Sequence, residues 1–81
     1  GMKVPRDLTG RELIAALSKL GYSVTRQSGS HIRITTERSG THHLTIPDHR
    51  PIKVGTLASI MRDLEQHHGM NRFELTRFLF G

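Results

Sequence analysis

Apolar residues recur with a helical period in two stretches of this chain. In the first, the spacing of three and four positions predicts a helix over residues 10–20 and involves Leu13, Ala16, Leu17 and Leu20. Thr9 and Glu12 have the spacing of a capping box, and Gly21 is placed to end this helix. In the second, the same spacing predicts a helix over residues 54–67 from Leu57, Ile60, Met61 and Leu64.

Between these helices, the polar and apolar residues alternate with the period of two that is typical of strands. The alternation predicts strands over residues 22–27, 31–37 and 41–46. Ser23, Thr25 and Gln27 are expected on the polar face of the first strand. The opposite, buried face is expected to hold Tyr22, Val24, Ile32, Ile34, Leu44 and Ile46. After Gly69, Asn71 and Glu74 indicate a short terminal helix. Its aromatic residues are expected to complete the core, and a partner surface formed by an exposed apolar face is the alternative.

The pairing of the last two strands follows from which residues must be buried together. A two-residue turn at Ser39-Gly40 would place Thr35 opposite Leu44 and mix polar with apolar residues on one face. A three-residue loop over 38–40 instead pairs Ile34 with Leu44 and suits a glycine in its last position. The same register pairs Ile32 with Ile46. It also places His31 opposite Pro47, with Asp48 and His49 close by.

The order helix, three strands, helix, helix predicts an α+β fold in which a three-stranded antiparallel sheet carries helices on one face. One domain over residues 2–81 is expected, and Gly1 is expected to be a scar of expression. The chain has no cysteine, which excludes disulfides and thiolate metal sites. We expect a cytoplasmic protein without contact to a membrane, because no run is apolar enough to span one and no secretion signal is recognisable. A net charge of +5 indicates a polyanion or an acidic protein as partner.

Candidate chemistry begins at the flexible turn Ser28-Gly29-Ser30, which ends in His31. Histidine titrates near neutral pH and can transfer protons there, although a histidine at a strand start can equally be a half-exposed surface residue. A second candidate is the start of the 54–67 helix, where Lys53 and Thr56 indicate either a phosphate site or ordinary capping. No metal is expected, because neighbouring residues such as His42-His43 and His67-His68 point in diverging directions.

Several motifs taken together resemble a known family. Leu20-Gly21-Tyr22, Arg26-Gln27 leading into Gly29-Ser30-His31, Ile46-Pro47 with His49, and Lys53-Val54-Gly55-Thr56-Leu57 are similar to the HicA (YcfA-like) toxins. These are small bacterial messenger-RNA ribonucleases of type II toxin–antitoxin systems. The resemblance implies a double-stranded-RNA-binding-domain-like fold, His31 as the catalytic histidine, and a HicB-type antitoxin that covers the RNA face. Many relatives carry a second histidine where this chain has Ile32.

These observations predict metal-independent, cofactor-free cleavage of RNA. His31 would act as the general base on a ribose 2′-hydroxyl, and His49 is the candidate acid. Arg33 and Lys53 are expected to stabilise phosphate charge. Further RNA contacts are expected from Ser28, Gly29, Ser30 and Thr56. Two other interpretations stay open: a non-catalytic RNA-binding module of the same fold, and a domain whose basic face meets only an acidic protein.

Overall fold

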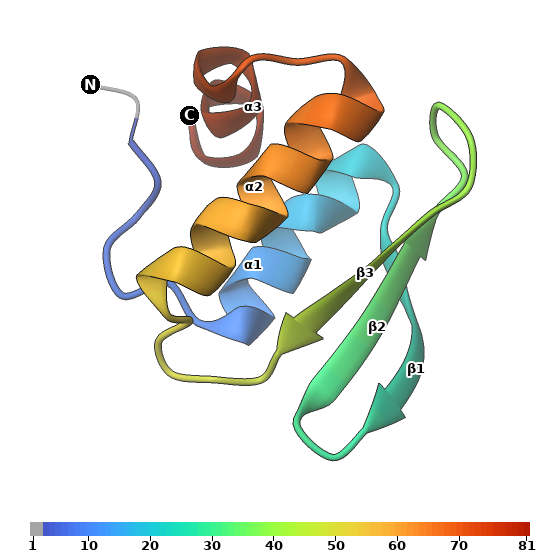
Figure 1. Cartoon of the computed structure of the whole chain (residues 1–81), viewed down its shortest axis with the longest axis vertical. Coiled ribbons are helices and arrows are strands. Elements are labelled where there is room, and N and C mark those ends of the chain that lie inside the picture. The colour runs from blue at the N-terminus through green and yellow to red at the C-terminus, as the bar shows by residue number, and fades with distance from the viewer. Residues whose placement is uncertain (1–2) are drawn as a thin grey trace.

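The computed structural model describes residues 3–81, and its elements follow the predicted order (Figure 1). Gly1 and Met2, the expected expression scar and the expected start of the domain, lie outside the described residues. The elements are α1 (Gly10–Leu17), the 3₁₀ turn η1 (Ser18–Leu20), β1 (Ser23–Ser28), β2 (His31–Thr36), β3 (His42–Pro47), α2 (Val54–His68) and α3 (Arg72–Phe80). The α+β fold class is confirmed. No helix in the described part of the chain is long and apolar enough to cross a bilayer.

The first helix begins and ends where its capping residues predict. The hydroxyl of Thr9 accepts a hydrogen bond from the Glu12 N–H at 3.1 Å, and the Glu12 carboxylate accepts one from the Thr9 N–H at 2.9 Å. The last turn tightens into η1, and Gly21 follows with a φ of 82°. A left-handed residue at this position is typical of a helix end, and glycine adopts it without strain.

The sheet has the order β1-β2-β3, with both pairs of strands antiparallel. The predicted register is confirmed, since Ile34 pairs with Leu44 and His31 pairs with Pro47. The connecting loop is longer than predicted, because the strands end at Thr36 and begin again at His42. Within this loop the Glu37 carbonyl accepts a hydrogen bond from Gly40 N–H at 3.2 Å, so a local turn replaces the last predicted pair.

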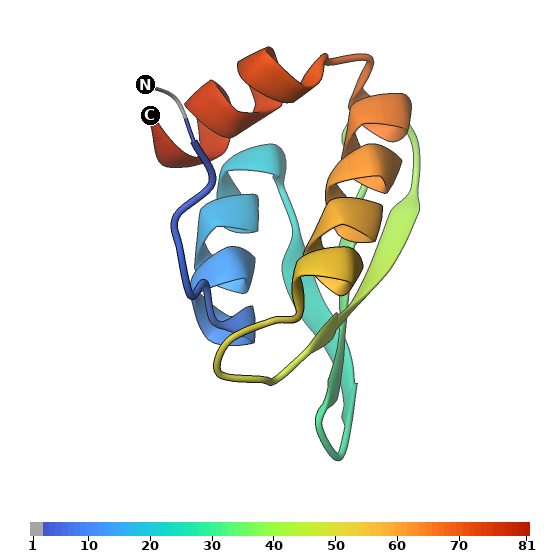
Figure 2. The same cartoon turned by 60° about the vertical axis from the view of Figure 1, so that its left-hand side comes forward.

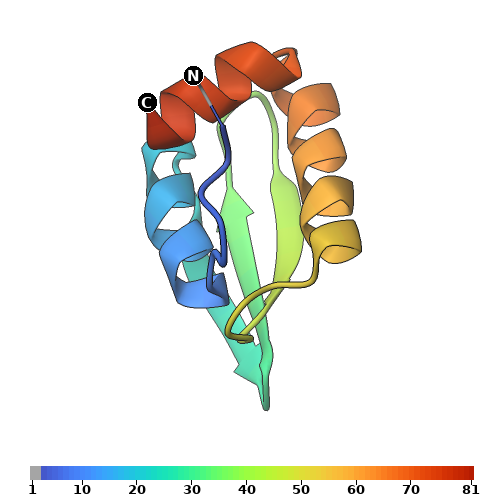
Figure 3. The ribbon, with the colours of Figure 1, turned by 90° about the vertical axis from the view of Figure 1, so that its left-hand side faces the viewer.

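Helices α1 and α2 pack on the same face of the sheet, and α3 lies across their ends (Figures 2 and 3). The core between these layers is built from Leu8, Leu13, Leu17, Leu20, Tyr22, Ile32, Ile34, Leu44, Ile46, Ile52, Ile60, Met61, Leu64, Leu75 and Leu79. No element of residues 3–81 covers the other face of the sheet, which we call the open face. The prediction that the terminal aromatics complete the core is wrong for Phe73 and Phe78, whose exposed fractions are 58% and 39%.

The first strand departs from strict alternation. Val24 pairs with Ile34 and Arg26 pairs with Arg33, so Thr25 is an extra residue in a β-bulge. The prediction that Val24 is buried is wrong, because β1 is the sheet edge and Val24 is 50% exposed. The bulge also shifts Arg26 to the open face, together with Arg33.

Candidate active site

His31 is the first residue of β2 and directly follows a tight two-residue turn. Ser28 and His31 pair across this turn, which consists of Gly29 and Ser30. Gly29 has a φ of 58°, as the first central residue of a type II′ hairpin turn requires. The turn thereby places the exposed imidazole of His31 at the tip of the β1–β2 hairpin, on the open face.

A hollow on the open face surrounds His31 and draws residues from all three strands. It is lined by Arg26, Ser28, His31, Arg33, His43 and Thr45. Two guanidinium groups thus share one hollow with a histidine, which is the combination that binds a phosphate and moves a proton beside it. Of the predicted contact residues, Ser28 and Arg33 line this hollow, whereas Gly29 and Ser30 form the turn beside it. Arg26 was not predicted as a site residue. The β-bulge that turns its side chain toward the hollow cannot be recognised from the alternation of polar and apolar residues in β1.

A row of hydrogen bonds across the open face holds the second histidine of the hollow. Nδ1 of His43 lies 2.8 Å from the hydroxyl of Thr35, which in turn lies 2.8 Å from the hydroxyl of Thr25. Of the residues that the structure describes, the second histidine lining this hollow is His43 rather than His49. The sequence led to no predicted role for His43 in this site.

The loop that carries His49 is fastened both to the hairpin tip and to the start of α1. The Asp48 N–H donates to the Ser30 carbonyl at 2.7 Å, and the Gly10 N–H donates to the His49 carbonyl at 3.0 Å. Asp48 also forms an ion pair with Arg11 at 3.2 Å. A Cβ on Gly10 would lie 2.0 Å from the Pro47 carbonyl oxygen, so only glycine allows this approach. The loop that carries His49 is therefore held at Ser30, the residue before His31, and the side chain of His49 is exposed.

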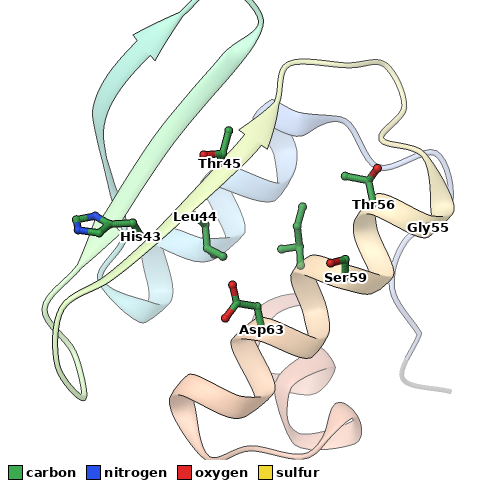
Figure 4. Close-up of a pocket in the computed structure, with 8 residues that line it drawn as sticks. His43, Leu44, Thr45, Gly55, Thr56, Ser59 and Asp63 are labelled. Atoms are coloured by element: carbon green, nitrogen blue, oxygen red, sulfur yellow. The ribbon is translucent and has the colours of Figure 1, made fainter.

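A second hollow lies between the outer edge of β3 and α2 (Figure 4). Thr56 lies here and not beside His31, and in Figure 4 the side chains of Ser59 and Asp63 extend from α2 toward β3. His43 and Thr45 line both hollows, so the two adjoin at β3.

The start of α2 borders this second hollow. Lys53 is the N-cap, and no side chain within residues 3–81 caps this helix, so the capping interpretation of Thr56 is not observed. The first amide groups of α2 are therefore open to an anion.

Comparisons with known proteins identify one similarity. A family model described as the HicA toxin of bacterial toxin–antitoxin systems matches residues 10–66, which is more than half of the 81 residues. The matched segment runs from the first residue of α1 into the last third of α2, and it contains His31, Arg33 and His49. Neither the curated proteins nor the solved structures include a match to this chain.

Proposed function

This chain belongs to the HicA toxin family, and on that premise we propose that it is an endoribonuclease that cleaves messenger RNA on the open face of its sheet. The observation that carries the proposal is the placement of His31 in one exposed hollow with the cross-strand pair Arg26 and Arg33. A HicB-type antitoxin is the proposed partner, and covering this basic hollow would be its means of inhibition. A cytoplasmic location is proposed with it, since that is where messenger RNA is found.

The proposed chemistry needs only proton transfer and charge stabilisation. His31 takes the proton of a ribose 2′-hydroxyl, and the 2′-oxygen attacks the adjacent phosphorus. The bond from phosphorus to the 5′-oxygen breaks, which leaves a 2′,3′-cyclic phosphate and a 5′-hydroxyl. Arg26 and Arg33 stabilise the negative charge that builds up on the phosphate oxygens. Because a single acid or base group contributes about 10²–10⁴-fold, cleavage is expected to be slow.

The 5′-oxygen must receive a proton as it leaves, and His49 is the proposed donor. Its loop is tied to the hairpin tip through the bond between Asp48 and Ser30, which keeps it beside the turn that presents His31. The competing candidate for the acid is His43, which lines the same hollow as His31. It pairs with Thr35, whereas His31 pairs with Pro47 at the opposite end of the β2–β3 ladder.

The two lining residues that the hollows share support a path for the RNA strand. From the hollow of His31, the strand would cross β3 over His43 and Thr45. It would then reach the uncapped start of α2, where Thr56 and the ammonium group of Lys53 contact a second phosphate. This path uses backbone and sugar contacts, and it requires no particular base sequence.

The proposal is tested by induced expression of the wild-type chain beside His31→Ala, with growth and new RNA ends as readouts. We expect growth arrest and 2′,3′-cyclic phosphate ends only with His31 intact. His31 is exposed, so its replacement is expected to leave the fold unchanged, which circular dichroism verifies. His43→Ala is the matched control within the same hollow. Arrest without new RNA ends, from both wild type and His31→Ala, would favour the non-catalytic RNA-binding module instead.

A further inference from the structure

Three histidines gather at the end of the molecule away from the hollow of His31. His42 is the first residue of β3, and His67 and His68 are the last residues of α2. The rings of His42 and His67 stack at 4.1 Å, and the rings of His67 and His68 meet at 4.7 Å and 86°. One ligand nitrogen from each ring lies within 4.8 Å of the other two. The sequence argument against a metal site considered only the adjacent pairs His42-His43 and His67-His68. The fold instead brings His42 from the first pair together with both members of the second.

This cluster is distinct from the proposed active site. His42 pairs with Thr36, which is five positions from His31 along β2, or about 17 Å at the rise of an antiparallel strand. All three histidines are partly buried, and none of them lines either hollow. The proposed RNA chemistry therefore leaves the cluster without a role.

The hydrogen bonds around the cluster determine where the ring protons lie. The Asp63 carboxylate can only accept, so Nε2 of His42 donates to it at 3.0 Å. With His42 neutral, its Nδ1 accepts from the Tyr22 hydroxyl at 2.6 Å. The only proton of that hydroxyl is then used, so Nε2 of His68 must donate to the Tyr22 oxygen at 2.9 Å.

This chain of donors leaves one buried lone pair without a partner. Nδ1 of His68 is buried and has no hydrogen-bond partner among the described residues. His67 is arranged in the same way, because its Nε2 donates to the Arg38 carbonyl at 3.0 Å and its Nδ1 is left unprotonated. His67 and His68 can therefore each offer the unprotonated nitrogen that a metal ion needs, and Nδ1 of His42 would do so by giving up its hydrogen bond from the Tyr22 hydroxyl.

We propose that His42, His67 and His68 together bind one Zn²⁺-type transition-metal dication. Neutral imidazole is a preferred ligand of this class of ion, and three protein ligands leave a fourth position for water. Ideal bond lengths of 2.0–2.1 Å place tetrahedral ligand nitrogens about 3.3 Å apart, so the rings must close in from their present separation. Rotation of His67 out of its stack on His42 supplies this movement, because the imidazole torsion is soft, and the Nε2 bond to the Arg38 carbonyl must re-form in the rotated position.

The surroundings of the cluster supply the outer contacts that such sites use. Metal-binding histidines usually donate their second N–H to a carboxylate or a backbone carbonyl. Here the Asp63 carboxylate accepts from His42, and the Arg38 carbonyl accepts from His67. A bound ion would join the start of β3 to the end of α2, and it would hold the 37–41 loop through Arg38. Because only the folded chain brings the three rings together, binding must raise the stability of the fold.

The experiment is a zinc titration of the tag-free full chain after chelator treatment, followed by calorimetry and thermal unfolding. We expect one Zn²⁺ per chain and a higher melting temperature with Zn²⁺ but not with Mg²⁺. His67→Gln and His68→Gln should weaken binding at least about tenfold, the loss that even outer contacts of metal sites cause. His43→Gln and His49→Gln, which remove histidines outside the cluster, are the matched controls and should bind as the wild type does.

Absence of zinc uptake by the folded wild-type chain in molar excess of zinc would overturn the proposal. Undiminished binding by both cluster variants would overturn it equally. Because a cluster variant can fail to fold, Co²⁺ uptake by the wild type is a second measurement. A tetrahedral nitrogen site gives intense visible absorption, whereas the weak spectrum of hydrated Co²⁺ would contradict the proposal. None of these readouts depends on RNA cleavage, so they succeed or fail independently of the proposed function.

Discussion

The bulge in β1 leads to a prediction about how RNA binding responds to salt. Thr25 is the extra residue, and it shifts Arg26 to the face that carries Arg33 and His31. If RNA lies in this hollow, Arg26→Gln must weaken binding through the loss of one phosphate contact. The change is made in a His31→Ala background, so that the RNA stays intact during the measurement.

The size of the effect follows from the charges in the hollow. Each cation that neutralises a phosphate on single-stranded nucleic acid contributes about 0.7 to the slope of log K against log salt. Arg26→Gln should therefore reduce the slope by about 0.7, and the double change with Arg33→Gln by about 1.4. Arg26 is exposed, so its ion pair is worth about 0.2–1 kcal/mol, which corresponds to a loss of affinity of about 1.5- to 5-fold at one salt concentration.

The assay is fluorescence anisotropy of a labelled single-stranded RNA over a series of salt concentrations. Arg62→Gln is the matched control, because it removes the same charge from the exposed side of α2. Its slope should equal that of the parent chain. Equal slopes for Arg26→Gln and Arg62→Gln would refute the reasoning, since the net charge alone would then explain RNA binding.

Three further predictions concern the acid, the α1 contact and the helix cap. His49→Ala should reduce the single-turnover rate of cleavage by about 10²-fold or more without a loss of RNA affinity, and His43→Ala should reduce this rate less. If His43→Ala reduces the rate more than His49→Ala does, His43 is the acid instead. Gly10→Ala should lower the free energy of unfolding by about 1–3 kcal/mol, because the new Cβ meets the Pro47 carbonyl. Gly55→Ala, where a Cβ meets nothing within 4 Å, is its control in urea unfolding and should not destabilise. The Thr9 backbone N–H holds the pKa of Glu12 below its ordinary value of 4.5. The resulting stabilisation is complete above that value and is lost as the pH falls through the lower folded pKa, so Glu12→Gln should reduce the acid dependence of the unfolding midpoint.

The fold could be predicted from the sequence wherever one face of an element is buried. A slip of one residue in the β2–β3 pairing would place Ile34 and Leu44 on opposite faces of the sheet and expose one of them, and this cost selects the register that the structure has. β1 has no such constraint, because all of its residues are exposed. An extra residue at Thr25 therefore costs little there, and the sequence could not reveal that Arg26 joins the site.

The histidine cluster was missed for a different reason. Reasoning from neighbour spacing compares residues within one strand or one helix, where adjacent side chains diverge. His42 meets His67 and His68 only because β3 and α2 pack with the start of the strand beside the end of the helix. Such a contact between distant segments depends on the packing of the whole core, which no local pattern contains.

The two proposals meet in β3, which is held at both ends. Pro47 is packed against Gly10 at one end, and His42 lies in the histidine cluster at the other. Between them, His43 and Thr45 line both hollows of the proposed RNA path. A metal ion in the cluster would therefore stabilise the strand that the RNA crosses, although it would lie too far from His31 to take part in the chemistry.

This separation makes the effect of a chelator informative. EDTA should lower the melting temperature of the zinc-bound chain by removing the ion from the cluster. At a temperature well below that of unfolding, the same treatment should leave the rate of RNA cleavage unchanged, because proton transfer by His31 needs no metal. Cleavage is therefore measured together with circular dichroism in the same chelated sample. Loss of cleavage by a chain that is still folded would contradict the metal-free mechanism, whereas loss of both together would locate the role of the metal in the fold.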